Sequence, residues 1–243
     1  SLHAEREPER VALICAGQSL TRAAIDRASN RLARDFEARG VSAGDFVTIA
    51  VPNGPQFLIS AFAAWKLGAV PQPISARLPD AERRAILERA SPALIVGAEP
   101  GAFSATPCLP EGHEPAAGLP DSPLPDRTSA HRQALASGGS TGAPKLIVDA
   151  LPASCDPTAP FYGNQPGTTV LTPGPLFHAG PFINSVVTLL GGGLLVLMQR
   201  FDPEQALALI ERHRVEWVNF VPTMMHRIWR LPEAIRTRYD LSS

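Results

Sequence analysis

The segment FVTIAVPNGPQFLISAFAAWKLGAVPQPI, residues 46–74, contains two short apolar runs on either side of a longer one. Residues 46–51 and 69–74 have the length and composition of buried strands, and residues 55–67 have those of a buried helix. Strands that alternate with helices in this way are typical of a parallel sheet with helices on its faces. The segment therefore predicts an α/β fold.

The same alternation continues on both sides of this segment. In residues 20–40 the apolar side chains recur every three or four positions, which predicts an amphipathic helix with Gly40 as its left-handed C-terminal cap. We expect further helices at 80–90, 181–190, 202–213 and 223–230. We expect further strands at 93–96, 133–137, 146–148, 169–171, 194–197 and 217–221. Together these elements predict parallel-rich sheets flanked by helices.

Residues 99–132 interrupt this pattern because prolines recur throughout them. Proline has no backbone N–H, so we expect a surface linker without regular backbone hydrogen bonding. The chain then divides into an α/β segment over 1–98, a proline-rich linker over 99–132 and a second α/β segment over 133–243. We expect both α/β segments to belong to one domain.

The composition is that of an ordinary globular protein, with 44% hydrophobic residues, 19% charged residues and a formal net charge of -1. The absence of a basic excess argues against a nucleic acid or an anionic membrane as partner. The scattered cysteines at 15, 108 and 155 indicate neither a disulfide framework nor a zinc site. The longest apolar run, 186–198, is too short for the roughly 20 residues of a membrane span. We expect a cytoplasmic protein without a transmembrane segment, and a homo-oligomer is compatible with this pattern.

A glycine-rich loop over residues 136–145, ASGGSTGAPK, is the strongest candidate for a binding site. Glycines let consecutive amide N–H groups point into one concavity, while hydroxyls and a lysine add donors and positive charge. Such a loop suits the phosphates of a nucleotide. The residues that supply these groups are Ser137, Gly138, Gly139, Ser140, Thr141, Gly142 and Lys145.

The loop differs from the P-loop of kinases and GTPases. That motif requires a lysine directly after the last glycine, followed by Ser or Thr. Here Ala143 and Pro144 separate Gly142 from Lys145, and Leu146 follows. The alternative interpretation of the loop is a surface turn that binds no ligand.

Two further segments carry candidate residues. In PLFHAG, residues 175–180, His178 is either a histidine hydrogen-bonded within a packed core or part of a site. In VPTMM, residues 221–225, Met224 and Met225 are either core residues that fill gaps or residues that face a ligand. The residue types alone leave both alternatives open.

The loop is similar to the phosphate loop of the adenylate-forming superfamily, which includes acyl-CoA synthetases of the AMP-dependent synthetase and ligase family. The superfamily pattern is S-G-T-T-G-x-P-K-G, and this sequence departs from it at Gly138 and Leu146. Ser137 could supply the hydroxyl that Gly138 lacks. The resemblance extends over most of the chain, including AWKLGAV at 64–70, PLFHAG at 175–180 and VPT at 221–223. It is weakest over 99–132 and 149–165.

This resemblance implies the N-terminal part of the large domain of an acyl-CoA synthetase-like fold. It implies that a carboxylic acid reacts with ATP to give an acyl-adenylate and pyrophosphate, and that coenzyme A then forms the thioester. The loop and Lys145 would hold the ATP phosphates, Thr141 would contact Mg²⁺, and Lys145 and His178 would act in catalysis. Phe177, His178 and Met224 would line the acid pocket.

Amino-acid-activating domains of the superfamily have Asp at the position of His178, which neutralises the substrate amine. His178 therefore favours a fatty acid or another acid without an α-amine. The superfamily residues that complete the reaction have no counterpart here, so we expect an incomplete N-terminal fragment that is inactive alone. The alternatives are a non-catalytic relative that binds a nucleotide or an acyl ligand, and an amino-acid-activating domain.

Overall fold

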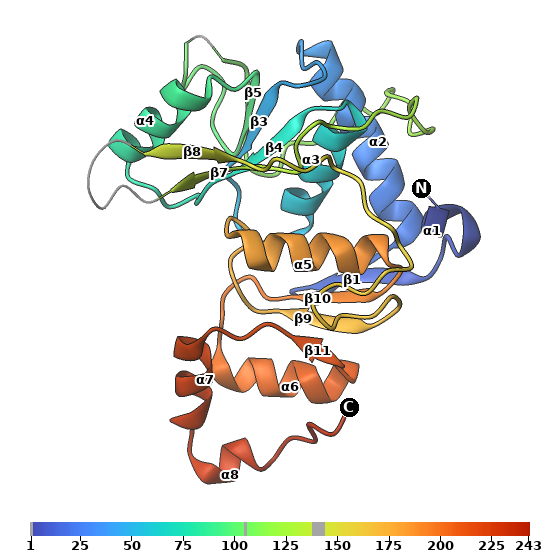
Figure 1. The fold of residues 1–243 in the computed structure, drawn as a ribbon, viewed down its shortest axis with the longest axis vertical. Helices are drawn as coiled ribbons and strands as arrows, with labels where there is room; N and C mark the ends of the chain where they lie inside the picture. Colours follow the sequence, from blue (N-terminus) through green and yellow to red (C-terminus); the bar gives the residue numbers. More distant parts are fainter. Residues whose placement is uncertain (1, 105, 138–143) are drawn as a thin grey trace. The chain divides into compact units, whose positions relative to one another are not determined.

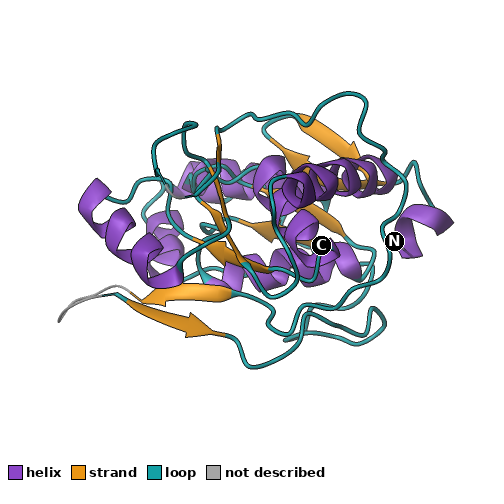
Figure 2. Cartoon of the chain, turned by 90° about the horizontal axis from the view of Figure 1, so that it is seen from above, coloured by secondary structure: helices purple, strands orange, loops and turns teal. Residues whose placement is uncertain are grey.

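The computed structural model describes residues 2–104, 106–137 and 144–243. The chain forms two compact units. The first unit contains residues 23–154, and the second contains residues 2–22 together with 155–243. Helices flank the strands of both units (Figures 1 and 2), and the predicted α/β class with parallel-rich sheets is confirmed.

The first unit is built around a four-stranded sheet in the order β4-β3-β5-β6, and every neighbouring pair is parallel. The strands are β3 (Phe46–Ile49), β4 (Val70–Pro73), β5 (Leu94–Val96) and β6 (Cys108–Leu109). The helices are α2 (Arg22–Ala38), α3 (Pro55–Lys66) and α4 (Asp80–Ala90). β4 and β5 are buried along their whole length, as the apolar runs in the sequence predict. The predicted cap at Gly40 is also confirmed, with a φ of 95°.

A hairpin of β7 (Ala134–Ser137) and β8 (Lys145–Val148) completes the first unit. Its strands are antiparallel, and Ser137 is paired with Lys145 at the end next to the glycine-rich loop. The sequence patterns predicted both strands but not their relative direction. A parallel connection needs a crossover of a dozen or more residues, and the stretch between Ser137 and Lys145 is too short to hold one.

The second unit contains a five-stranded sheet in the order β11-β9-β10-β1-β2. Its strands are β1 (Val11–Cys15), β2 (Gln18–Thr21), β9 (Thr169–Thr172), β10 (Leu194–Leu197) and β11 (Trp217–Val218). All neighbours are parallel except β1 and β2, which form a hairpin. α5 (Ala179–Leu190) lies on one face of the sheet and α6 (Pro203–His213) on the other (Figure 1).

Three short helices belong to the same unit: α1 (Leu2–Arg6), α7 (Pro222–Trp229) and α8 (Glu233–Arg236). The sequence patterns predicted α7 but neither α1 nor α8. They also missed β1, although VALIC at 11–15 is an apolar run of strand length. In the described part of the chain, no helix combines the length and the apolar composition that crossing a bilayer requires.

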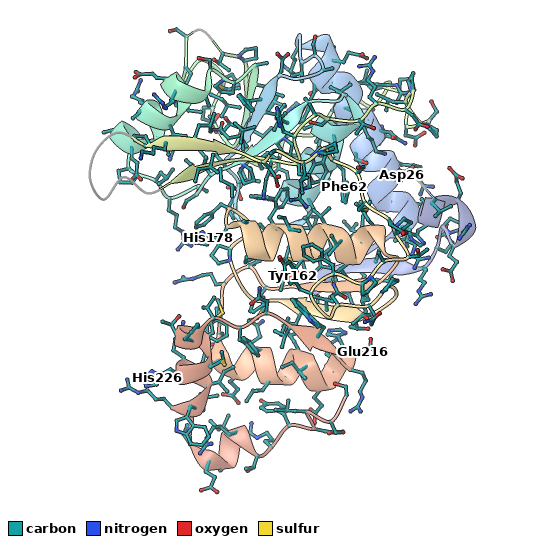
Figure 3. All side chains as sticks on the ribbon, in the orientation of Figure 1. Asp26, Phe62, Tyr162, His178, Glu216 and His226 are labelled. Atoms are coloured by element: carbon teal, nitrogen blue, oxygen red, sulfur yellow. The ribbon has the colours of Figure 1, made fainter. Side chains whose placement is uncertain are left out.

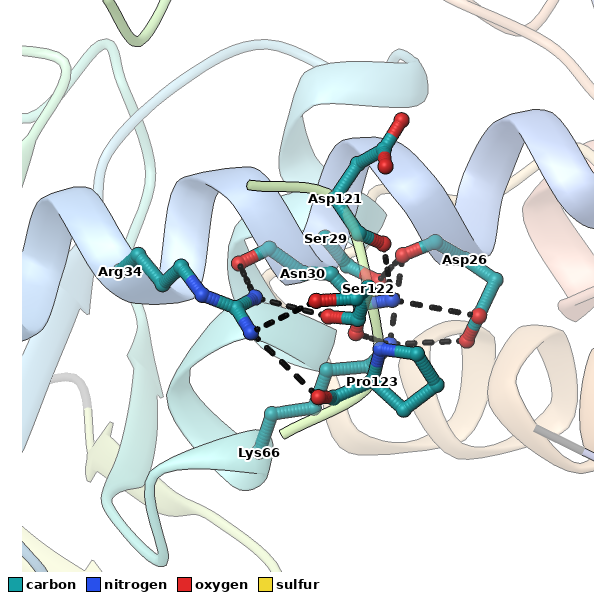
Figure 4. A network of polar contacts seen from close by, with 8 residues as sticks. All are labelled: Asp26, Ser29, Asn30, Arg34, Lys66, Asp121, Ser122 and Pro123. Carbon is teal, nitrogen blue, oxygen red and sulfur yellow. Dashed lines mark hydrogen bonds and ion pairs between the residues drawn. The ribbon is translucent and has the colours of Figure 1, made fainter. Parts of the chain in front are cut away.

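The proline-rich residues 99–132 contain one strand that the prolines do not suggest. This strand is β6, where Cys108 and Leu109 are buried and extend the parallel sheet beside β5. Farther along, α2 side chains donate to backbone carbonyls of this segment (Figure 4). Asn30 Nδ2 donates to the Asp121 carbonyl at 2.8 Å, and Arg34 Nη1 donates to the Ser122 carbonyl at 2.8 Å. Because prolines reduce the number of backbone donors, side chains of α2 provide the missing hydrogen bonds.

An ion pair joins α2 to α3 within the same polar network (Figure 4). Lys66 Nζ lies 2.8 Å from Asp26 Oδ1, and it also donates to Asn30 Oδ1. Burial tends to raise the pKa of Asp26, yet this pKa lies below its usual value, and the hydrogen bond and the charge of Lys66 are the largest of the effects that lower it. Burial lowers the pKa of Lys66, against the opposing effect of Asp26. The pair therefore depends on both charges being present.

Replacing Lys66 by Met should lower the free energy of unfolding by about 2 kcal/mol, between the values typical of exposed and buried pairs. The pair stabilises the fold above the unfolded-state pKa of Asp26, about 3.9, and this contribution is lost as the pH falls through the lowered folded-state value. Urea unfolding of both proteins at pH 7 and near pH 3 measures this difference. Arg127→Gln, which removes an exposed pair with Glu37, is the control and should have little effect. An equal loss for Lys66→Met at both pH values would contradict the assignment.

Candidate active site

The candidate site of the second unit lies where β9 and β11 end. Both strands are parallel to their neighbours, so their carboxyl ends lie at the same edge of the sheet. This edge is where ligands bind in open α/β sheets. β9 leads into residues 173–178 and then into α5, while β11 leads into Asn219 and then into α7. Side chains from these two connections can therefore act on one ligand.

His178 is the residue that precedes α5, and Figure 3 shows it at the start of that helix. Its backbone is extended, with φ -96° and ψ 143°, and its side chain makes no capping hydrogen bond. The His178 side chain is exposed, so the interpretation as a histidine within a packed core is wrong. The half-buried Phe177 ring lies beside it, with ring centroids 4.4 Å apart. Leu176 is fully buried and anchors the segment to the core.

Met224 reaches the same segment from α7. Its side chain is half-buried, and its Cε lies 3.9 Å from the position that a Cβ on Gly174 would occupy. The Asn219 side chain approaches from the end of β11, with Nδ2 3.5 Å from the corresponding position on Gly180. The structure thus brings Met224 and Asn219 to the connection that carries Phe177 and His178. Met225 is exposed.

The residues predicted to hold phosphate belong to the first unit. Lys145 is the first residue of β8, and its side chain is exposed. β7 lies beside β4, and β8 lies beside α4. A P-loop connects a strand to a helix, whereas the loop here connects two antiparallel strands. The structure therefore agrees with the rejection of the P-loop motif.

Several predicted residues cannot be placed. Gly138, Gly139, Ser140, Thr141 and Gly142 lie outside the described residues, and for Ser137 only the backbone is described. The predicted contact of Thr141 with Mg²⁺ therefore stays a prediction. Among the residues that the structure does describe, no three His, Cys, Asp or Glu side chains gather into a group able to hold a metal ion.

Asn219 and Gly174 were not among the residues predicted for the site. A signal for both exists in the sequence, because each follows directly or closely after a strand of the parallel sheet. Neither residue lies in a motif that resembles a known one.

The chain matches the family model described as AMP-binding enzyme over residues 1–243. It therefore belongs to the AMP-binding enzyme family, as the resemblance of its loop and of its other motifs indicated.

Among curated proteins, the chain is 32% identical over 236 residues to feruloyl-CoA synthase of Amycolatopsis sp, covering 93% of this chain and 48% of that protein. It is 30% identical over 268 residues to pyochelin synthase PchD of Pseudomonas aeruginosa, covering 99% of this chain and 49% of the relative. The chain thus spans about half the length of these relatives.

Two solved structures share the fold. The N-terminal domain of FACL13 from Mycobacterium tuberculosis matches with a TM-score of 0.82 and 22% identity, covering 99% of this chain and 66% of the other. The o-succinylbenzoate CoA synthetase MenE from Bacillus subtilis matches with a TM-score of 0.78 and 23% identity, covering 97% of this chain and 65% of the other. These likenesses confirm the predicted acyl-CoA synthetase-like N-terminal domain fold.

Gly174 should tolerate no side chain, because a Cβ there would lie 2.8 Å from Pro181 Cγ on α5. Gly174→Ala should therefore displace the start of α5 and lower the free energy of unfolding by about 1–3 kcal/mol, as overpacking does. Urea unfolding measures the loss. Gly118→Ala is a matched control, because a Cβ at Gly118 meets nothing within 4 Å. Equal stability of both variants would show that the contact with Pro181 imposes no constraint.

Proposed function

We propose that this protein activates a carboxylic acid with ATP, forms an acyl-adenylate and then transfers the acyl group to coenzyme A. The observation that carries the proposal is the placement of His178 and Phe177 at the carboxyl edge of a parallel sheet, in a chain of the AMP-binding enzyme family. The exposed imidazole can donate a hydrogen bond to a carboxylate or to the oxygen of an acyl-adenylate. The adjacent aromatic ring offers an apolar surface to the body of the acid.

The first chemical step brings two anions together, since a carboxylate attacks the α-phosphorus of ATP and pyrophosphate leaves. Positive charge and oriented donors must offset this repulsion. We assign this role to the loop residues Ser137 to Gly142 and to Lys145. Lys145 is the first residue of β8 and follows the loop directly, and its exposed ammonium is suited to neutralising a phosphate. Mg²⁺ would share the phosphate charge, with Thr141 as the contact in this chain.

The acid class follows from the charges at the site. An α-amino acid would bring a cation that needs a nearby carboxylate, whereas residues 174–180 contain no Asp or Glu. We therefore propose a fatty acid or another acid without an α-amine as substrate, with Phe177, His178 and Met224 around it. Two of the relatives are a feruloyl-CoA synthase and a sulfoacetate–CoA ligase, so CoA ligases of quite different acids resemble this chain.

We also propose where the protein acts in the cell and how its segments are organised. The free thiols of Cys15, Cys108 and Cys155 are compatible with a reducing cytoplasm. We propose that residues 1–98 and 133–243 act as parts of one N-terminal domain, and that these 243 residues alone do not turn over substrate. A homo-oligomer is compatible with this function.

The first experiment is ATP–pyrophosphate exchange by the full-length protein that contains this chain, across fatty, aryl, bile and amino acids. Exchange that depends on an acid without an α-amine supports the proposal and identifies the acid. Exchange with amino acids only would establish the amino-acid-activating alternative. A folded protein that binds ATP but catalyses no exchange would establish the non-catalytic alternative, for which the departures at Gly138 and Leu146 leave room.

Lys145→Ala in the full-length protein should raise the KM for ATP in the exchange reaction by about tenfold or more, the loss expected for one charge-assisted hydrogen bond. The fold should be unaffected because the Lys145 side chain is exposed. Lys145→Arg keeps the charge and should retain most of the affinity. An unchanged KM for ATP in Lys145→Ala would remove Lys145 from the phosphate site.

A further inference from the structure

The second unit has a groove on the face of its sheet beside α6. The groove has a volume of about 610 Å³ and lies next to the part of the sheet formed by β10, β1 and β2. Its floor follows one line across the strands, because Ile14 pairs with Val196 on β10 and with Ser19 on β2. Val196 is buried under α6, Ile14 is half-buried and Ser19 is exposed. The cover that α6 provides therefore ends over β1.

Four basic side chains line this groove: Arg200, Arg212, His213 and Arg227. Arg200, Arg212 and Arg227 form no ion pair with a carboxylate among the residues that the structure describes. Elsewhere in this unit, ion pairs with carboxylates are formed by Arg10, Arg22, Arg214 and Arg238.

The acidic residues near the groove are already engaged. Asp202 lines the groove, but its Oδ1 accepts the Gln205 backbone N–H at 2.8 Å as the N-cap of α6. Glu204 and Glu211 of α6 accept hydrogen bonds from residues 238–240. The groove lining contains the carboxylate of Asp202 against the three guanidinium groups of Arg200, Arg212 and Arg227, so its positive charge is only partly offset.

The groove is also lined by apolar side chains. Leu209 of α6 and Phe201 after β10 line it together with Ile14 and Val196. The Arg227 guanidinium lies over the Phe201 ring, 4.9 Å from its centroid, so one cation is held against the apolar surface. Burial, followed by the charge of Arg212, lowers the pKa of His213, which is consistent with a crowded basic cluster.

We propose that this groove binds an organic anion, with a phosphate or carboxylate head and a short apolar body, through residues other than Phe177, His178 and Met224. Arginine pairs with both head groups through parallel hydrogen bonds, and the half-buried Ile14 and Leu209 side chains would contact the body. The volume lies within the roughly 300–1,000 Å³ of small-molecule sites. The proposal does not depend on the adenylation function.

The test is calorimetric titration of this chain with octyl phosphate below its micelle concentration. We expect saturable binding at one site, and binding weaker by about tenfold for inorganic phosphate and for octanol, which each lack one part of the ligand. Equal affinity for octanol would overturn the role of the cations. Equal affinity for inorganic phosphate would overturn the role of the apolar floor.

Variants locate the site. Arg200→Gln and Arg212→Gln should each weaken octyl phosphate binding by about tenfold, the loss expected for a charge-assisted hydrogen bond. Arg230→Gln, an exposed residue outside the groove, is the matched control. Leu209→Ala should weaken octyl phosphate more than inorganic phosphate. Circular dichroism checks that each variant is folded.

Lys145→Ala separates the groove from the glycine-rich loop, and it should leave octyl phosphate binding unchanged. Loss of binding in Lys145→Ala, with full binding in Arg200→Gln and Arg212→Gln, would assign the ligand to the loop and overturn the proposal. Unchanged binding in all three variants would also overturn it.

Discussion

The pairing of β1 with β10 is the contact on which the second unit depends. It joins Leu13 to Leu195 in a parallel register, so residues near the start of the chain complete a sheet that is otherwise formed after residue 168. Both side chains are fully buried. Without this pairing, β10 would lose a neighbour, the floor of the groove would lose Ile14, and the strands that support His178 and Asn219 would form a smaller sheet.

Such non-local pairing explains what the sequence could and could not predict. The bounds of α4 and β10 agree with the predictions because a helical or apolar pattern is a local property of the residues. Two strand pairings were harder to predict, that of β1 with β10 and that of β7 with β8. A run such as 11–15 shows that a strand can form, but only tertiary contacts decide that it joins β10. The direction of β8 depends on the length of the preceding loop, which the alternation of elements does not take into account.

In the candidate site, too, some residues could be predicted from the sequence and others only from the structure. His178 and Met224 could be named because they lie in motifs that resemble known ones, whereas Asn219 lies in no such motif. What unites them is the direction of β9 and β11, since parallel strands deliver their following residues to one edge. Sequence motifs therefore identified His178 and Met224 as candidate residues, and the parallel strands of the structure locate the candidate site at the carboxyl edge of the sheet. Of the loop that would hold ATP, the structure describes only the flanking residues, so its role rests on sequence and family.

The two sets of cations in this chain differ in a way that bears on function. In the first unit, Arg31 and Arg34 of α2 donate to backbone carbonyls of the proline-rich segment, which lacks backbone donors. In the groove, Arg200 and Arg212 have no such task, and the nearby carboxylates bond to backbone or to residues 238–240. Conformational entropy opposes gathering long charged side chains at one place unless they gain contacts there. An anion in the groove would supply those contacts, whereas the cations of α2 already have theirs.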